Sequence, residues 1–169
     1  NISSVPVDFN FTVYDDYNMS NCTFYTNISS LNQTINITYM GTNNSKLYNI
    51  TLSPPDGLYV WNILCFDNAT KADWYNTNST ILIDTNAPLI YLESPSDGYS
   101  VSSDSISITF NYNTTDNHSD VNNCSLILNN LIDQTNSTIT ESTTQTFTKT
   151  LSVGSYTWQV NCTDYQAHI

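Results

Sequence analysis

The stretch GLYVWNILCFD at residues 57–67 returns, 97 residues later, as GSYTWQVNCTD at residues 154–164. Both copies follow the pattern Gly-x-Tyr-x-Trp-x-x-x-Cys-x-Asp. Tyr, Trp, an aliphatic residue and Cys stand two positions apart, so on a strand their side chains all point to the same face. The pattern predicts one β-strand, used twice, with a buried apolar face and a turn at its leading glycine.

Two other segments repeat in the same order along the chain. Residues 21–23, Asn-Cys-Thr, return as Asn-Cys-Ser at 123–125, after 102 residues. The alternating segment 7–13, with Val, Phe, Phe and Val at every second position, returns at 106–112, after 99 residues. Three features that keep their order at nearly constant spacing indicate that a whole structural unit is duplicated.

Both copies have the composition of an all-β protein. The chain holds 24 Asn, 21 Ser, 24 Thr and 12 Tyr, and no segment carries a 3.6-residue apolar period. Thr, Tyr and Ile favour strands. We expect strands at 5–14, 20–28, 33–40, 46–53, 58–67 and 79–84 in copy one, and at 88–93, 104–113, 122–129, 143–152 and 155–164 in copy two. Short strands at this spacing predict two tandem immunoglobulin-like β-sandwich domains, residues 1–85 and 86–169.

The two copies differ in phase. Copy two has a strand, 88–93, before its counterpart of the first strand of copy one, and copy one ends with a strand, 79–84, that copy two lacks. We therefore expect repeat 1 to miss its first strand and repeat 2 its last. Either the chain is a window from a longer array, which we prefer, or neighbouring chains complete the sheets by strand addition, because an open edge invites aggregation.

The join between the copies is distinctive. It reads IDTNAP at 83–88, then LIYLE at 89–93 and SPSDG at 94–98. Together with the Gly-x-Tyr-x-Trp strand and Cys-x-Asp, this join resembles the tandem immunoglobulin-like repeats of large archaeal and bacterial cell-surface proteins, of the S-layer, filament or adhesin type. The resemblance covers essentially the whole chain and implies the fold and an extracellular or cell-surface location. A fold by itself does not imply an activity.

The charge balance argues against several partners. Only Lys46, Lys71 and Lys149 are basic, against 15 acidic residues, and the net charge is −12. Proteins that bind nucleic acid neutralise phosphates with Lys and Arg, so nucleic acid is not expected as a partner, and neither is an anionic membrane surface. The chain has no run of 18 apolar residues and no signal-peptide pattern at its start, so we expect no membrane insertion of this segment.

The four cysteines fall two in each copy, at corresponding positions. Cys22–Cys65 and Cys124–Cys162 are therefore the expected pairs among three possible connectivities, and each would stabilise its repeat by about 4 kcal/mol. The competing interpretation is a zinc site, but the chain has no Cys-x-x-Cys and only two histidines. Disulfides indicate an oxidising compartment. Because Cys22 falls on the strand after 5–14, and each Trp falls on the strand of the second Cys, we expect the bond to join neighbouring strands rather than the two sheets.

Asn-x-Ser/Thr sequons include 16 of the 24 asparagines, where chance gives about six. On a strand, residues i and i+2 face the same way, and a polar outer face raises that expectation to about ten. Sixteen still exceeds it, so we predict N-glycosylation, since asparagines beside inward apolar residues face solvent. Besides Asn1, the candidate sites are Asn10, Asn18, Asn21, Asn27, Asn32, Asn36, Asn43, Asn49, Asn68, Asn78, Asn113, Asn117, Asn123, Asn136 and Asn161.

Acidic side chains recur in corresponding loops of the two copies. Their carboxylates are ligands that Ca²⁺ accepts, but Asp is equally typical of turns, and the turn interpretation is preferred. The calcium candidates near the loops and repeat junctions are Asp15, Asp16, Asp67, Asp84, Asp116 and Asp120, with Asp164. Trp74-Tyr75, expected on a loop, is either an exposed contact pair or packs against the neighbouring repeat.

The sequence offers no catalytic constellation. His118 and His168 stand in polar surroundings, and no Gly-rich phosphate loop or nucleophile elbow is present. We therefore expect no enzyme and no cofactor apart from N-glycans or calcium. The leading hypothesis is a structural subunit of an extracellular filament or surface layer, a homopolymer built by head-to-tail or strand-addition contacts. The alternatives are an adhesin stalk or ligand-binding module, and a non-catalytic region of a large secreted enzyme.

Overall fold

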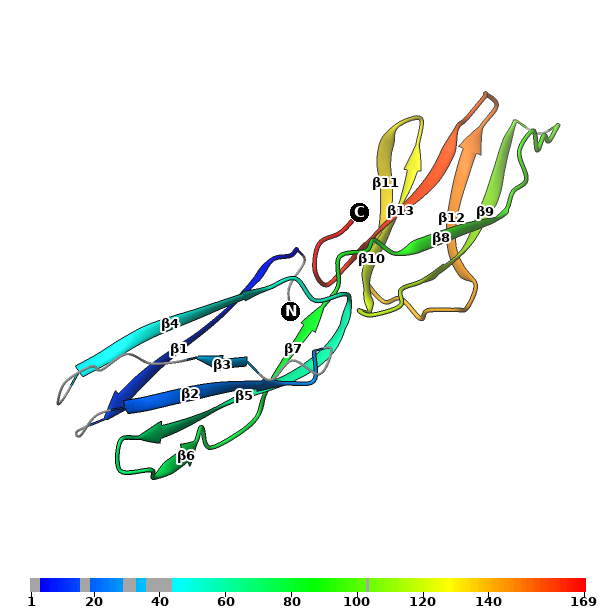
Figure 1. The fold of residues 1–169 in the computed structure, drawn as a ribbon. Helices are drawn as coiled ribbons and strands as arrows, with labels where there is room; N and C mark the ends of the chain where they lie inside the picture. The colour runs from blue at the N-terminus through cyan, green and yellow to red at the C-terminus, as the bar shows by residue number, and fades with distance from the viewer. Residues whose placement is uncertain (1–3, 16–18, 29–32, 36–43, 103) are drawn as a thin grey trace. The chain divides into compact units, whose positions relative to one another are not determined.

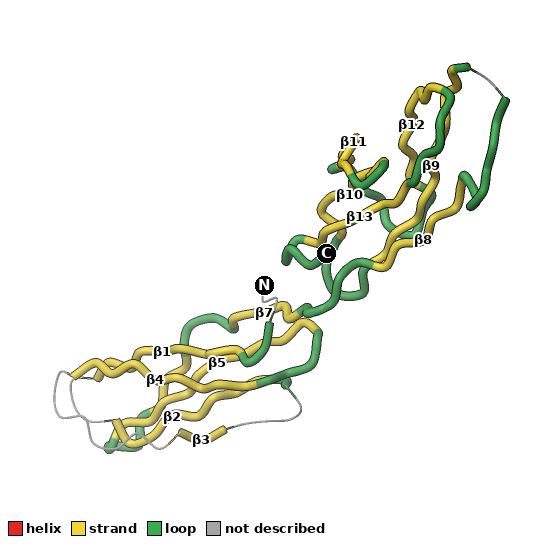
Figure 2. The backbone as a smooth tube through the Cα atoms, turned by 90° about the horizontal axis from the view of Figure 1, so that it is seen from above, coloured by secondary structure: helices red, strands yellow, loops and turns green. Residues whose placement is uncertain are grey.

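The structure of the chain, a computed structural model, describes residues 4–15, 19–28, 33–35, 44–102 and 104–169. The fold divides into two compact units, Asn1–Thr85 and Asn86–Ile169. Strands and loops make up both units, and Figure 2 shows no helix among the described residues. The predicted fold class, all-β with two immunoglobulin-like β-sandwiches, is confirmed.

Unit 1 consists of two antiparallel sheets (Figure 1). Its described strands are β1 (Val7–Asp15), β2 (Met19–Thr26), β3 (Gln33–Ile35), β4 (Asn44–Leu52), β5 (Gly57–Asp67), β6 (Ala72–Trp74) and β7 (Ser79–Ile83). One sheet pairs β1 with β4, and the other has the order β3-β2-β5-β6, with β7 also pairing β5. The strand that carries the repeated Gly-x-Tyr-x-Trp-x-x-x-Cys-x-Asp pattern, the Trp/Cys strand, is β5 in the first repeat, and it lies at the centre of the larger sheet.

Unit 2 repeats this plan with one strand added, and its described residues contain no counterpart of β6 or β7. Its described strands are β8 (Leu89–Ser94), β9 (Ser105–Thr115), β10 (Val121–Leu128), β11 (Leu131–Asn136), β12 (Gln145–Ser152) and β13 (Trp158–Asp164). One sheet has the order β12-β9-β8 and the other the order β11-β10-β13. The second copy of the Trp/Cys strand, β13, is the last strand of its sheet among the described residues.

Aromatic contacts between the sheets define the core of each unit. In unit 1, the ring of Phe9 on β1 lies 5.1 Å from Phe24 on β2 and 5.4 Å from Trp61 on β5. In unit 2, Phe110 on β9 lies 5.2 Å from Trp158 on β13. Edge-on and tilted aromatic pairs at this spacing contribute to stability beyond the area they bury. The equivalent Phe–Trp pair therefore holds the two sheets together in each unit.

These contacts correct the alignment of the first strand. The repeat found in the sequence aligns Phe110 with Phe11, at a spacing of 99 residues. In the structure Phe110 is instead equivalent to Phe9, at a spacing of 101, because each contacts the tryptophan of its unit. The error is two residues because side chains on a strand alternate with a period of two. A slip of two leaves every residue on its original face.

Several predicted strand boundaries were wrong. Two strands were not predicted, β6 and β11, and the strand expected at 155–164 begins only at Trp158. Strand β11 follows a two-residue turn at Asn129 and Asn130, both of which have positive φ (49° and 65°). Asparagine tolerates that conformation, which two-residue hairpins require. The rest of the strand expected at 33–40 lies outside the described residues.

Both disulfides are present, and each joins directly opposed residues of neighbouring strands. Cys22 on β2 faces Cys65 on β5, and Cys124 on β10 faces Cys162 on β13. The predicted pairing is confirmed, as is the prediction that the bond joins neighbours within one sheet. Antibody domains differ, because there the disulfide links the two sheets. Here the aromatic core connects the sheets, and the disulfide fixes the register of the central strand pair.

Replacing Cys124 and Cys162 together by Ala should lower the free energy of unfolding of unit 2 by about 2–4 kcal/mol, because the open chain gains conformational entropy when unfolded. Chemical denaturation of the oxidised chain and the double variant measures this difference. Ser107→Ala, at an exposed position of β9, is the matched control and should change stability by less than about 0.5 kcal/mol. An unchanged midpoint in the double variant would contradict the assigned role of the bond.

Candidate functional sites on the two units

The aspartate of Cys-x-Asp closes the same turn in both units. Asp67 Oδ1 accepts a hydrogen bond from the backbone N–H of Lys71 at 2.8 Å, and Asp164 Oδ1 accepts one from the N–H of His168 at 3.0 Å. Both bonds span four residues. The residue before each donor has a left-handed backbone, with φ of 64° at Thr70 and 69° at Ala167. The repeated aspartate therefore shapes a turn.

Asp164 is the more constrained of the two aspartates, because it is 1% exposed. Its Oδ1 also accepts the N–H of Gln166 at 2.7 Å, and its Oδ2 lies 2.6 Å from Nδ1 of His168. Burial raises the pKa of Asp164, but the hydrogen bonds from His168 and Gln166 act against burial and bring that pKa below its ordinary value. The ionised carboxylate is thus the form that unit 2 stabilises.

Asp164→Ala should destabilise unit 2 by about 1.5–3 kcal/mol at pH 7, the range for hydrogen bonds to a charged group. Since the folded-state pKa is lowered, this contribution is fully present above the unfolded pKa of about 3.9 and is lost as the pH falls through the folded pKa. Urea unfolding of both proteins between pH 7 and pH 3 measures it. The exposed Asp120→Ala is the control, and a difference that stays constant to pH 3 would contradict the assignment.

Carboxylates also organise the β9–β10 loop. Asp116 Oδ1 accepts the N–H groups of His118 and Ser119, both at 3.0 Å. The carboxylate of Glu141 accepts the N–H groups of Asp116 and Val121, both at 2.8 Å. Asp116 therefore forms the turn in this loop. Sequence reasoning missed Glu141 because it lies 25 residues beyond Asp116 in the chain. In unit 1 the corresponding Asp15 ends β1, and Asp16 lies outside the described residues.

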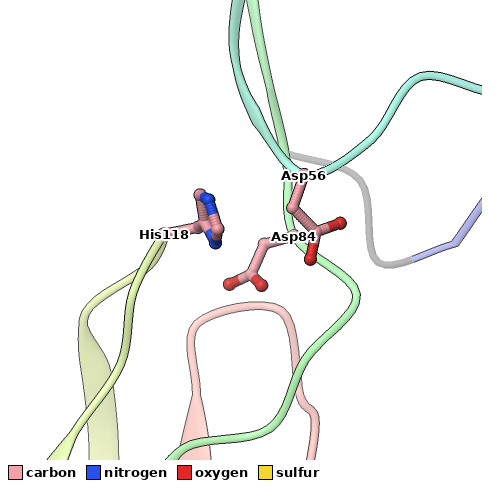
Figure 3. Close-up of side chains that lie close together, drawn as sticks. All are labelled: Asp56, Asp84 and His118. Atoms are coloured by element: carbon pink, nitrogen blue, oxygen red, sulfur yellow. The ribbon is translucent and has the colours of Figure 1, made fainter.

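Two acidic side chains meet at one end of unit 1 (Figure 3). Asp84 directly follows β7 and is fully buried, and one of its carboxylate oxygens lies within 4.8 Å of one from Asp56, on the turn before β5. The hydroxyl of Thr85 donates to both oxygens of Asp56, at 3.0 and 3.2 Å. Asp67 lies at the other end of β5. Calcium binding stays a prediction. Of its candidates, the structure brings Asp84 beside Asp56, a residue that sequence reasoning missed.

None of the described sequon asparagines is buried. Six are exposed: Asn10, Asn27, Asn49, Asn68, Asn78 and Asn117. Five are half-buried: Asn21, Asn113, Asn123, Asn136 and Asn161. Four candidates, like Asn1, lie outside the described residues: Asn18, Asn32, Asn36 and Asn43. Every described candidate is therefore at least partly exposed, and attachment of a glycan requires exposure.

Some sequons face each other across neighbouring strands. Asn10 and Asn49 are direct partners on β1 and β4, and Asn49 Nδ2 donates to Asn10 Oδ1 at 2.9 Å. In unit 2, Asn123 faces Thr163, the third residue of the Asn161 sequon, and its Nδ2 donates to that hydroxyl at 2.8 Å. A glycan bonds to Nδ2, so these hydrogen bonds engage the atom that would be modified.

We expect glycan occupancy to be higher at Asn68 and Asn117 than at Asn123. The first two are exposed on turns, whereas the amide nitrogen of Asn123 is half-buried and bonded to Thr163. Glycopeptide mapping by mass spectrometry of protein from its native source measures the occupancy at each site. The variant Thr163→Ala frees the Asn123 amide but also removes the Asn161 sequon. Higher occupancy at Asn123 than at the turns would contradict the expectation.

A second asparagine role was missed by sequence reasoning. Asn27 donates its backbone N–H to Val60 O at 3.3 Å and accepts the N–H of Val60 on its Oδ1 at 2.8 Å. Asn129 makes the same two contacts with Thr157, both at 2.9 Å. The spacing of 102 residues between the asparagines matches that of the first cysteines. The repeat itself held the signal, since both asparagines tie the end of one strand to the start of the Trp/Cys segment.

Trp74 and Tyr75 lie on the outside of unit 1. Trp74 is the last residue of β6, not a loop residue as predicted, and is 45% exposed. Its ring lies 4.8 Å from that of Tyr25 on β2, and Tyr75 is 66% exposed. The pair therefore offers aromatic surface beside the sheet.

No helix among the described residues is long and apolar enough to cross a membrane. No family model matches the sequence, and neither does any curated protein. Among solved structures, the chain is similar to the fibronectin(III)-like modules of Clostridium thermocellum CbhA, with 12% identity and a TM-score of 0.43 over 95% of this chain and 78% of that one. This similarity is too distant to add to what the strand order already establishes.

Proposed function

We propose that the chain is a non-catalytic structural segment of an extracellular filament or surface layer, N-glycosylated and in contact with copies of itself. The observation that carries this proposal is the combination, in both units, of an internally cross-linked sandwich with a surface rich in sequons. Disulfides persist in oxidising compartments. Glycans on the exposed asparagines would hydrate the surface of a chain that has only 18 charged side chains of the Asp, Glu, Lys and Arg types.

Exposed apolar residues on edge strands support contacts between copies. Leu131 and Ile132 are 73% and 70% exposed and adjacent on β11, which has a described partner strand on only one side. Leu47 on β4 is 64% exposed. Contacts that bury such residues gain hydrophobic free energy. Since a net charge of −12 makes copies repel each other, apolar and hydrogen-bonded contacts are the expected form of association.

An adhesin stalk or ligand-binding module is the second candidate function. The observation that favours it is the exposed aromatic pair Trp74 and Tyr75, since aromatic residues are enriched at the centres of protein interfaces. In that case the repeats would hold a binding surface away from the cell, and copies of the chain would have no ordered contacts with one another.

Electron microscopy of the native material distinguishes these functions. The structural proposal predicts an ordered filament or lattice in which density from one copy joins the next, with glycan density over the described sequons. Isolated flexible rods that end in a different domain would contradict it and favour the stalk.

A further inference from the structure

The outer face of the larger sheet of unit 1 carries two aromatic rings in contact. The residues on either side of Asn62 on β5 pack against the core, so Asn62 itself points to the outer face. Tyr25 on β2 lies directly opposite Asn62. Trp74 on β6 lies opposite Leu64, and its ring is 4.8 Å from the ring of Tyr25. This contact, the Trp74–Tyr25 pair, therefore crosses β5 between Leu64 and Asn62.

Asn62 also fixes the orientation of the sequon residue Asn78. Its Oδ1 accepts the backbone N–H of Ile63 at 2.7 Å. Its Nδ2 donates to Tyr75 O at 3.2 Å and to Asn78 Oδ1 at 2.8 Å. Because a backbone carbonyl only accepts, the atom of Asn62 between these two groups is the nitrogen, and the atom of Asn78 that meets it is the oxygen. This network therefore does not use Nδ2 of Asn78, the atom to which a glycan bonds.

Asn78 differs in this respect from two other sequon asparagines. Asn49 and Asn123 donate from Nδ2, so their attachment atoms are engaged. Asn78 accepts on its oxygen instead, and its side chain is exposed. Thr80, the third residue of the same sequon, is exposed as well. Attachment of a glycan at Asn78 is therefore compatible with its hydrogen bond to Asn62.

The sequon and the aromatic pair lie along the same edge of β5. Strand β6 ends at Trp74, opposite Leu64, and β7 begins one residue after Asn78. The hydrogen bond from Asn62 places Asn78 about two strand positions, roughly 7 Å, from Trp74 along β5. A sugar attached to Asn78 is thus next to the outer face on which the indole ring lies.

A second sequon asparagine on this face lies on the other side of the pair. Asn21 precedes the buried Cys22 on β2 and so points outward, and it lies opposite Phe66 on β5. Phe66 and Asn62 are on opposite sides of Leu64 along the strand. Because the Trp74–Tyr25 pair spans the stretch from Leu64 to Asn62, it lies toward Asn78 and not toward Asn21.

Trp74 has the chemistry of a surface that a sugar covers. It is 45% exposed, whereas Trp61 and Trp158 are half-buried in the cores of their units. A pyranose ring has a face of C–H groups, and placing this face on an indole ring removes apolar area of both from water. The C–H groups also meet the negative face of the aromatic quadrupole. Covalent attachment at Asn78 makes the contact intramolecular, which raises the effective concentration of the sugar.

We propose that Asn78 carries an N-glycan whose first sugar packs on the Trp74–Tyr25 pair and covers this part of the outer face. The inference rests on the proposed N-glycosylation of the chain and deepens it, since it gives one glycan a structural role in unit 1. The occupant of the exposed indole ring is the chain's own glycan, because the link through Asn78 holds a sugar beside the ring, which a free saccharide lacks.

The test uses the chain of residues 1–169 secreted from cultured animal cells, with each glycan trimmed enzymatically to its first N-acetylglucosamine and occupancy mapped by mass spectrometry. Thr80→Ala removes the Asn78 sequon but keeps Asn78 and its hydrogen bond to Asn62. Thr80→Ser keeps the sequon and is the matched control. Loss of the sugar should raise acrylamide quenching of tryptophan fluorescence, because Trp74 becomes accessible. It should also speed amide hydrogen exchange in β5 by about three- to tenfold, as loss of one such contact predicts.

Two further variants assign these effects to the contact. In a Trp74→Thr background, Thr80→Ala should no longer speed amide exchange in β5, because the ring on which the sugar packs is absent. Asn21→Gln removes the other candidate glycan of this face, and it should leave the quenching of tryptophan fluorescence unchanged.

Four results would overturn the proposal: no sugar at Asn78 in a chain that carries one at Asn68, equal quenching in the Thr80→Ala and Thr80→Ser chains, equal acceleration of exchange with and without Trp74, or saturable binding of free N,N′,N″-triacetylchitotriose at Trp74 of the glycosylated chain. The last result would make the ring a receptor for an external saccharide. The sugar is attached in the expression host, so these failures are distinguishable from the absence of glycans, filament or surface layer in the native material.

Discussion

The structure depends on the antiparallel pairing of the Trp/Cys strand with the strand that carries the first cysteine. In both units this pair has a disulfide at directly opposed positions and places a tryptophan against the phenylalanine of the facing sheet. Burial of these aromatic rings holds the sheets together, and the covalent bond prevents the central pair from changing register. The other strands extend or cover this centre.

Around that centre, hydrogen bonds of polar side chains shape the loops, where many proteins use ion pairs. Four described carboxylates accept backbone N–H groups at turns, those of Asp67, Asp116, Glu141 and Asp164. Three others, those of Asp8, Asp56 and Glu93, accept threonine hydroxyls. Asp133 forms an ion pair instead: the Lys149 ammonium lies 2.6 Å away and holds the pKa of that carboxyl below its ordinary value. An Asn in each unit ties the end of one strand to the start of the Trp/Cys segment. With so few basic residues, directional hydrogen bonds define the loops.

The same composition shapes the surface. Asn, Ser and Thr occupy outward strand positions and give each sheet a polar outer face. At alternate positions the same residues form sequons, so one sequence pattern suits both the β-structure and the attachment of glycans. The pairing of Asn10 with Asn49 and of Asn123 with Thr163 shows the consequence: potential acceptors meet across strands because both strands follow the same alternation.

The sequence by itself determined the fold class, the disulfide pairs and the buried face of the predicted strands, because alternation and duplication can be recognised from residue spacing alone. It did not determine the alignment of the first strand between the repeats, because a slip of two residues keeps every side chain on its face. It also did not determine the start of β13, where residues 154–157 have no described partner strand. It also missed Glu141 and Asp56, whose roles depend on groups distant in the chain. Only the tertiary structure decided these features, since a strand exists where another strand satisfies its backbone hydrogen bonds.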